Sequence, residues 1–222
     1  MKVYPRKDLD HSFKNLFSAL AIASTPSLEK KTIENEFENL WQEENLVTGL
    51  SVRTIFDSFL TSQNFDEGSE VIMSGITIPD MVKIVESHKL KIVPVDMDMA
   101  TLQVNSESIT NAITGKTIMV IVAHLFGSRM KMEPIYIALS NHPHIMIVED
   151  CAQAFDGVNG YVKGHMTDMS LFSFGTIKSI TALGGAIAFV KKPELSKAIK
   201  TNLGNYPKIK DSEFLIKALK YL

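Results

Sequence analysis

Two stretches in the middle of the sequence are so uniformly apolar that both faces of the strands they predict must be covered. Residues 116–123 contain Ile-Met-Val-Ile-Val, and residues 145–148 read Ile-Met-Ile-Val. Strands that are buried on both faces occur almost only in parallel sheets, where crossover helices cover each face. The two stretches therefore favour an α/β domain over an all-helical or all-β fold.

Strand and helix patterns alternate around these two stretches. The predicted strands are 46–49, 70–74, 90–95, 116–123, 145–148, 169–174 and 186–190, and the predicted helices start after Ser51 and span 79–88, 106–113, 132–139, 193–203 and 214–222. The last two strands are too close for a helical crossover, so we expect neighbours joined by a loop, with an antiparallel pairing left open. The pattern predicts three layers: a mostly parallel central sheet with helices on both faces.

The first 41 residues predict a helical arm. Apolar side chains recur at helical spacing in two segments, 11–23 and about 28–41, with Thr-Pro-Ser between them at 25–27. Such an arm can pack on its own domain or on a partner subunit. We therefore divide the chain into the arm, residues 1–41, and one larger domain, residues 42–222.

Composition excludes several classes of partner and site. The chain has 23 Lys and Arg against 25 Asp and Glu, so no basic face is expected for nucleic acid or an anionic membrane. No apolar run approaches the roughly 20 residues that span a bilayer. Cys151 is the single cysteine, which excludes an intrachain disulfide, and the cytoplasm is the expected compartment. His142 and His144 flank a proline and lack a third ligand, so we expect a turn and no metal.

Polar residues follow the carboxyl ends of several predicted strands, where open α/β sheets bind their ligands. Asp150 ends one strand, His124 follows another, and Ser173 closes a third, with Lys178 five residues further on. Taken alone, a strand-end aspartate more often caps a helix, and a lysine is usually solvated. Their joint placement makes a ligand site the better interpretation.

The chemistry of pyridoxal phosphate (PLP) matches this set. PLP needs a lysine for a Schiff base, a carboxylate at the pyridine nitrogen, and hydroxyl and backbone N–H groups for its phosphate. Lys178, Asp150 and Ser173 can meet these needs. A glycine turn at Gly49 that feeds a helix start is a further candidate phosphate seat, although taken alone such a turn more often serves plain chain reversal.

Several motifs together resemble the DegT/DnrJ/EryC1/StrS family of sugar aminotransferases. They are D-C-A-Q at 150–153, S-F-G-T-I-K at 173–178, G-G-A at 184–186, H-L-F-G at 124–127 and P-V-D-M-D at 94–98. The resemblance implies the PLP-dependent transferase fold of type I and PLP as the cofactor. It also implies a homodimer, an amino donor such as glutamate, and a nucleotide-linked keto-sugar as the amino acceptor.

The same resemblance implies individual roles. Lys178 would form the Schiff base and shuttle a proton, and the family's dehydratase branch has histidine there, so a lysine favours transamination. Asp150 would pair with the pyridine nitrogen, Gln153 would lie near the phenolic oxygen, and Ser173 would bind phosphate. His124 and the phosphate turn complete the expected cofactor site; the turn comprises Thr48, Gly49, Leu50 and Ser51.

Three departures from the family pattern leave an alternative open. Leu50 stands where a phosphate-binding threonine is expected, with Ser51 as a possible substitute, and Ile78 stands where an aromatic usually stacks on the cofactor. The C-terminal small domain of the family is absent from this sequence. The alternative function is a catalytically silent domain of the same fold with a regulatory or assembly role.

Overall fold

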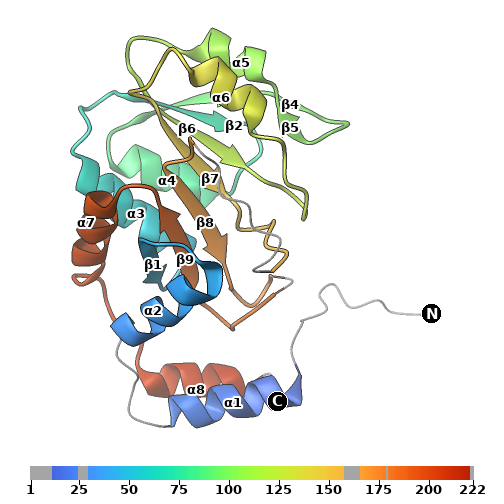
Figure 1. Ribbon diagram of the computed structural model, residues 1–222, viewed down its shortest axis with the longest axis vertical. Helices are drawn as coiled ribbons and strands as arrows, with labels where there is room; N and C mark the ends of the chain where they lie inside the picture. The colour runs from blue at the N-terminus through green and yellow to red at the C-terminus, as the bar shows by residue number, and fades with distance from the viewer. Residues whose placement is uncertain (1–11, 25–29, 158–165, 179, 221–222) are drawn as a thin grey trace.

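The computed structural model describes residues 12–24, 30–157, 166–178 and 180–220 (Figure 1). Its strands are β1 (Leu46–Gly49), β2 (Glu70–Ser74), β3 (Lys91–Val95), β4 (Met97–Asp98), β5 (Gln103–Val104), β6 (Thr117–Ala123), β7 (Met146–Asp150), β8 (Met169–Ser173) and β9 (Ala186–Val190). Its helices are α1 (Phe13–Ala23), α2 (Lys30–Trp41), α3 (Val52–Gln63), α4 (Pro79–Ser87), α5 (Ser106–Ala112), α6 (Glu133–Leu139), α7 (Pro193–Leu203) and α8 (Asp211–Leu219). Each predicted strand and helix is present among the described residues, with ends shifted by a few residues at most; the predicted ends at 11, 28 and 222 and the Thr-Pro-Ser stop at 25–27 lie outside those residues.

Seven of the described strands form one sheet, in the order β1-β9-β8-β7-β6-β2-β3. Neighbouring strands from β8 to β3 are parallel, whereas β9 is antiparallel to both β8 and β1. Because β9 reverses direction between them, β1 runs the same way as β8. The prediction of a mostly parallel sheet is confirmed, and the open question about the last two strands is resolved as an antiparallel pair.

Helices cover both faces of this sheet, as the three-layer prediction requires. Helices α3, α4 and α7 pack on one face over a core that includes Phe56, Met81 and Ile199. Helices α5 and α6 pack on the other face around Ile109 and Ile135, and α2 extends that layer over β1 and β9. We call these the α3 face and the α6 face.

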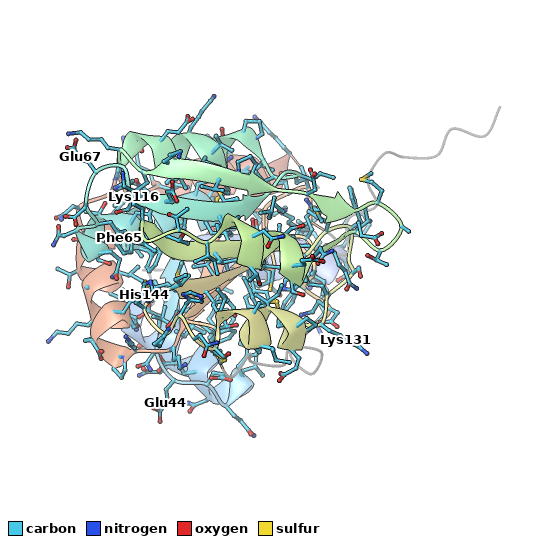
Figure 2. The ribbon with its side chains drawn as sticks, turned by 90° about the horizontal axis from the view of Figure 1, so that it is seen from above. Glu44, Phe65, Glu67, Lys116, Lys131 and His144 are labelled. Atoms are coloured by element: carbon cyan, nitrogen blue, oxygen red, sulfur yellow. The ribbon has the colours of Figure 1, made fainter. Side chains whose placement is uncertain are left out.

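The two edges of the sheet, at the amino and carboxyl ends of its parallel strands, are distinguishable in Figure 2. Glu44, Glu67, Lys116 and His144 each precede a strand, and they lie along one side of the molecule, whereas Lys131, in the connection after β6, lies on the opposite side. The turn that contains His142 and His144 is therefore at the amino edge. The strand ends that carry the predicted site lie at the carboxyl edge.

Helix α2 is fastened to the outer edge of β1 by two carboxylates. Glu38 Oε1 accepts the Leu46 N–H at 3.0 Å, and Glu34 Oε1 accepts the Thr48 N–H at 3.1 Å. Glu34 also pairs with Lys200 Nζ of α7 at 3.0 Å. Half of the predicted arm is thus part of the layer that covers the α6 face.

Helix α1 lies beside α8, apart from the sheet (Figure 1). Leu16 and Leu20 of α1 pack with Ala218 and Phe214 of α8, and Leu183 from the β8–β9 loop joins them. The prediction of a division at residue 41 remains a prediction. Among the described residues, no helix combines the length and apolarity needed to span a membrane.

The sequence patterns did not predict the small β4–β5 hairpin. Asp98 Oδ1 accepts the N–H groups of Ala100 and Thr101 at 2.8 and 3.0 Å, and these bonds lower the pKa of the Asp98 carboxyl. Leu102 follows with a left-handed φ of 56°. The turn is therefore set by a side-chain cap, which hydrophobic periodicity does not report.

Candidate active site

The strand register brings the ends of β1, β7 and β8 together at the carboxyl edge. Asp150 lies opposite Leu171 of β8, Ser173 lies opposite Ala186 of β9, and Gly49 lies opposite the same alanine. Side chains alternate along a strand, so Asp150 and Ser173 share the face of Leu171, which belongs to the core beneath α3. The predicted carboxylate and hydroxyl therefore lie on the α3 face, next to the start of that helix.

Asp150 is a half-buried acid with an incomplete set of partners. Its Oδ1 accepts the Ala152 N–H at 3.0 Å, and no other hydrogen bond of its carboxyl is found among the described residues. Burial raises the pKa of the Asp150 carboxyl above its ordinary value of 3.8; the Ala152 bond and the charge of Lys178 oppose this only in part. A cation held beside Asp150 would favour its ionised form.

The charges of Lys178 and Asp150 influence each other's pKa. Burial lowers the pKa of the Lys178 amine below its ordinary value of 10.5; Asp150 opposes the shift and the Arg53 guanidinium adds to it. A lysine with a lowered pKa is neutral more of the time, which makes it a better amine nucleophile.

The loop that carries Lys178 is held by backbone hydrogen bonds. The Lys178 N–H donates to the Gly175 carbonyl at 3.0 Å, and the N–H groups of Ala182 and Gly184 both donate to the Phe174 carbonyl. Gly185 has a left-handed φ of 86°, which suits glycine, and its N–H donates to the Leu50 carbonyl at 3.2 Å. The loop is thereby tied to the segment that leads into α3.

The N-terminus of α3 follows the segment to which the Lys178 loop is tied, so it lies next to that loop. Ser51 caps this helix, and its Oγ accepts the Thr54 N–H at 3.2 Å. The N–H groups of the first turn of a helix, together with the helix dipole, attract anions. Arg53 stands in this turn and adds a positive charge, although its guanidinium also pairs with Asp80 at 2.7 Å. The expected phosphate seat therefore consists of backbone groups and Ser173.

The structure places Thr48 differently from the prediction and leaves the prediction for Leu50 untested. Thr48 donates its hydroxyl to Glu34 Oε1 at 2.9 Å, and the same carboxylate accepts its N–H, so Thr48 faces α2 on the opposite face of the sheet. Leu50 leaves an apolar side chain 43 % exposed and contributes its carbonyl to the loop contact. The Ser51 hydroxyl accepts a hydrogen bond as the helix cap. Its predicted contact with a phosphate remains a prediction.

His124 is also placed differently from the prediction. Its side chain has no exposed surface, its Nε2 lies 2.8 Å from Glu149 Oε2, and its Nδ1 accepts the Met130 N–H at 3.2 Å. Glu149 is aligned with Val122, which packs against α6, so the imidazole lies on the α6 face. A direct contact between this ring and a ligand beside Asp150 does not fit that arrangement.

Gln153 is exposed and joined to the turn after β6. Its Oε1 accepts the Phe126 N–H at 3.2 Å, and its carbonyl accepts the Gly127 N–H at 2.9 Å. The side-chain amide nitrogen of Gln153 is a donor at the same edge as Asp150. Its predicted proximity to a bound ring remains a prediction.

Sequence reasoning missed Arg53 and Glu149. Arg53 follows a glycine turn within the first turn of a helix, where a cation lies next to any bound anion. Glu149 is an acid inside an otherwise apolar strand, and a charge there requires buried partners. Cys151 is buried, and burial raises the pKa of its thiol.

Known proteins with sequence similarity match most of this chain. The model of the DegT/DnrJ/EryC1/StrS aminotransferase family matches residues 22–209. GDP-perosamine synthase from Escherichia coli O157:H7 is 32 % identical over 157 residues, which are 68 % of this chain and 43 % of that protein. The chain thus spans less than half the length of this curated relative.

Solved structures share the fold at lower identity. GDP-4-keto-6-deoxymannose-3-dehydratase with a trapped PLP-glutamate geminal diamine superposes with a TM-score of 0.76 at 20 % identity, over 89 % of this chain and 54 % of that one. The sugar aminotransferase CalS13 from Micromonospora echinospora gives a TM-score of 0.75 at 19 % identity, over 89 % and 57 %. At these identities the comparison establishes the fold.

Proposed function

Since this chain belongs to the DegT/DnrJ/EryC1/StrS aminotransferase family, we propose that it is the cofactor-binding part of a PLP-dependent sugar aminotransferase. The observation that carries the proposal is that Lys178 and Asp150 influence each other's pKa through their charges, and that Asp150 shares the α3 face of the sheet with Ser173. A carboxylate, an amine of lowered pKa and an anion seat at the same edge are what PLP requires.

The residues present fit the cofactor group by group. Asp150 has an oxygen without a partner among the described residues, and a protonated ring nitrogen would supply the missing cation. Ser173 and the first N–H groups of α3 would hold the phosphate, assisted by the charge of Arg53. When bound, PLP supplies an electron-accepting ring for the reaction. Gln153 would donate to the phenolic oxygen.

Lys178 has two tasks in this proposal. Its amine would hold the cofactor covalently through the aldehyde, with loss of water, and the amine once freed by a substrate amine would move a proton at the reacting carbon atoms. A lowered pKa serves both tasks because the amine must be neutral to attack and to accept a proton. The lysine also favours amino transfer over dehydration.

The substrate proposal follows the relatives named above. We take a nucleotide-linked keto-sugar as the amino acceptor, because one relative is a GDP-perosamine synthase. We take glutamate as the donor, because a protein of the same fold was trapped with a PLP-glutamate geminal diamine. A homodimer would cover the apolar side chains exposed around the site, of which Phe126 is 72 % and Ile177 61 % exposed. The cytoplasm remains the proposed compartment.

Borohydride trapping tests the cofactor proposal. The purified chain is mixed with PLP, reduced, digested and analysed by peptide mass spectrometry. We expect the pyridoxyl group on Lys178 and its loss in Lys178→Ala. Lys217→Ala is the matched control, because Lys217 Nζ lies 3.4 Å from the position of a β-carbon on Gly184 in the same loop. Labelling spread over surface lysines, unchanged in Lys178→Ala, would contradict the proposal.

The silent-domain alternative is favoured by one observation. Leu50 presents an exposed apolar side chain at the edge where a phosphate-binding hydroxyl was expected. A silent domain would bind PLP without reacting with an amino donor, so glutamate would leave the visible absorbance of the complex unchanged. Amino transfer predicts instead that glutamate removes this absorbance and that a keto-sugar restores it.

A further inference from the structure

A buried polar cluster lies on the α6 face, directly behind the candidate site. His124 and Glu149 are at its centre, with side chains that are 0 % and 1 % exposed. Glu149 Oε1 also accepts the Thr167 hydroxyl, and Thr167 Oγ1 lies 2.8 Å from the Tyr136 hydroxyl of α6. The proposed function gives this cluster no task, although it joins β7 to α6 and to the segment before β8.

The hydrogen bonds indicate which tautomer of His124 fits this cluster. The Met130 N–H can only donate, so Nδ1 must present its lone pair at 3.2 Å. A neutral imidazole then carries its hydrogen on Nε2, which points at Glu149 Oε2. His124 therefore accepts from the turn after β6 with one nitrogen and donates to the end of β7 with the other.

Glu149 is placed to be an anion in this cluster. Burial alone would raise the pKa of the Glu149 carboxyl, but the bonds from His124 and Thr167 and the nearby Arg129 charge outweigh it, and the pKa is lowered from its ordinary value of 4.5. Arg129 Nη2 lies 3.9 Å from Oε2. The ligand atoms of Cys151, His124 and Glu149 lie within 4.8 Å of one another, a grouping that could hold a metal ion. Both nitrogens of His124 are already engaged in hydrogen bonds, however, so neither is available as a ligand.

Two segments of the candidate site meet at this imidazole. One runs from Asp150 to Gln153, and the His124 backbone N–H donates to the Asp150 carbonyl at 3.0 Å. The other is the turn of residues 125–130, whose Phe126 and Gly127 N–H groups donate to Gln153. The imidazole fastens this turn through Met130 and the strand end through Glu149. Removing either bond would let the two segments shift relative to each other.

We propose that His124 is a positioning residue, which works with Glu149 from the far face of the sheet to hold Asp150 and Gln153 in place for the pyridine ring. This role rests on the proposed function and replaces the direct cofactor contact expected from the sequence. In this role the imidazole of His124 does not contact the cofactor. It fixes the positions of the Asp150 carboxylate and the Gln153 amide, which do.

Two near-isosteric variants separate the two bonds. In His124→Asn the side-chain oxygen can still accept from Met130 but cannot reach Glu149, whereas in His124→Gln the side-chain nitrogen can reach Glu149 but leaves Met130 without its acceptor. We expect each variant to weaken PLP binding by about tenfold, as is typical for groups that orient a ligating residue. Ile147→Ala is the matched control, because Ile147 is buried on the same face of β7 without polar contacts of its side chain.

Three measurements decide the proposal: the PLP dissociation constant, the visible spectrum of the complex, and amide hydrogen exchange of the cofactor-free chain at Phe126, Gly127 and Met130. Positioning predicts weaker binding, an altered spectrum and faster exchange at Phe126 and Gly127 in the His124 variants. Ile147→Ala should lose thermal stability and retain the affinity and the spectrum. The proposal is overturned if the His124 variants behave like this control.

The design also separates failure of this proposal from failure of the proposed function. If the unaltered chain does not form the Lys178 adduct, the proposed function fails, and the role of His124 in positioning cofactor ligands fails with it. Hydrogen exchange then still decides whether His124 fastens the two segments. If the adduct forms and only the His124 variants lack an effect, the proposed function stands and the positioning role is wrong.

Discussion

Gly49 and Ile55 pack so closely that a β-carbon on residue 49 would stand 2.6 Å from Ile55 Cγ1. Residue 49 ends β1 and Ile55 lies in the first turns of α3, so this contact sets how near the helix starts to the sheet. Glycine is required here by the approach of the helix. The anion seat at the start of α3 depends on that approach.

Gly49→Ala should therefore lower the free energy of unfolding by about 1–3 kcal/mol, the usual cost of overpacking. Urea denaturation measures the change. Gly115→Ala is the control, because a β-carbon there meets nothing within 4 Å. The double variant Gly49→Ala/Ile55→Ala should lose less stability than the sum of the losses in the two single variants, because the clashing atom is gone. Full additivity would show that the contact is not the cause.

Replacing Asp150 should make Lys178 reactive at lower pH. The Asp150 carboxylate favours the ammonium form of Lys178 and partly opposes the effect of burial on its pKa. Asp150→Asn removes that charge, so the pKa of the amine should fall further. Competitive acetylation followed by mass spectrometry gives the pH at which Lys178 becomes half reactive. Glu107→Gln, a remote exposed change, should leave that pH unchanged; an upward shift in Asp150→Asn would refute the assigned interaction.

Glu149 should stabilise the fold in a pH-dependent way. Its folded-state pKa is below the ordinary 4.5, so its ionised form contributes stability above about pH 4.5, and the contribution is lost as the pH falls through the folded value. The difference in unfolding free energy between the unaltered chain and Glu149→Gln should shrink as the pH is lowered from 7 to 4. Thermal melts across that interval test the sign. A difference that grows toward acid would mean that Glu149 is buried as a neutral acid.

Thr48→Val and Ser173→Ala should separate stability from cofactor binding. Thr48 bonds to Glu34 of α2, so its valine variant should lose about 1–3 kcal/mol of stability while PLP affinity stays the same. Ser173 lies on the α3 face beside the proposed phosphate seat, so Ser173→Ala should weaken PLP binding. Absorbance titration and thermal melts measure both properties. Weaker PLP binding in Thr48→Val would restore the expectation drawn from the sequence.

Most of the fold could be predicted because apolar periodicity reports burial directly. The uninterrupted apolar runs of β6 and β7 indicated a sheet covered on both faces, and the short spacing between β8 and β9 left room only for a loop. The β4–β5 hairpin escaped because a single cap, Asp98, specifies it.

The candidate site was harder to predict because sequence order does not state which face a residue occupies. Asp150 and Glu149 are neighbours in the chain, yet one points to the α3 face and the other to the α6 face. His124 and Thr48 were expected to bind the cofactor, and alternation places both side chains on the α6 face, opposite to that of Asp150 and Ser173. Motif spacing located the edge of the sheet, and alternation along each strand decided which side chains reach the site.

The carboxylates of Glu34 and Glu38 also determine what β1 can do in solution. An outermost strand with unpaired N–H groups invites another chain to add to it, which is a common route to aggregation. Here the Leu46 and Thr48 amides are already occupied. Another chain could pair with β1 only after α2 detaches. Loss of this helix should therefore expose an edge strand at which intermolecular β-sheet assembly can begin.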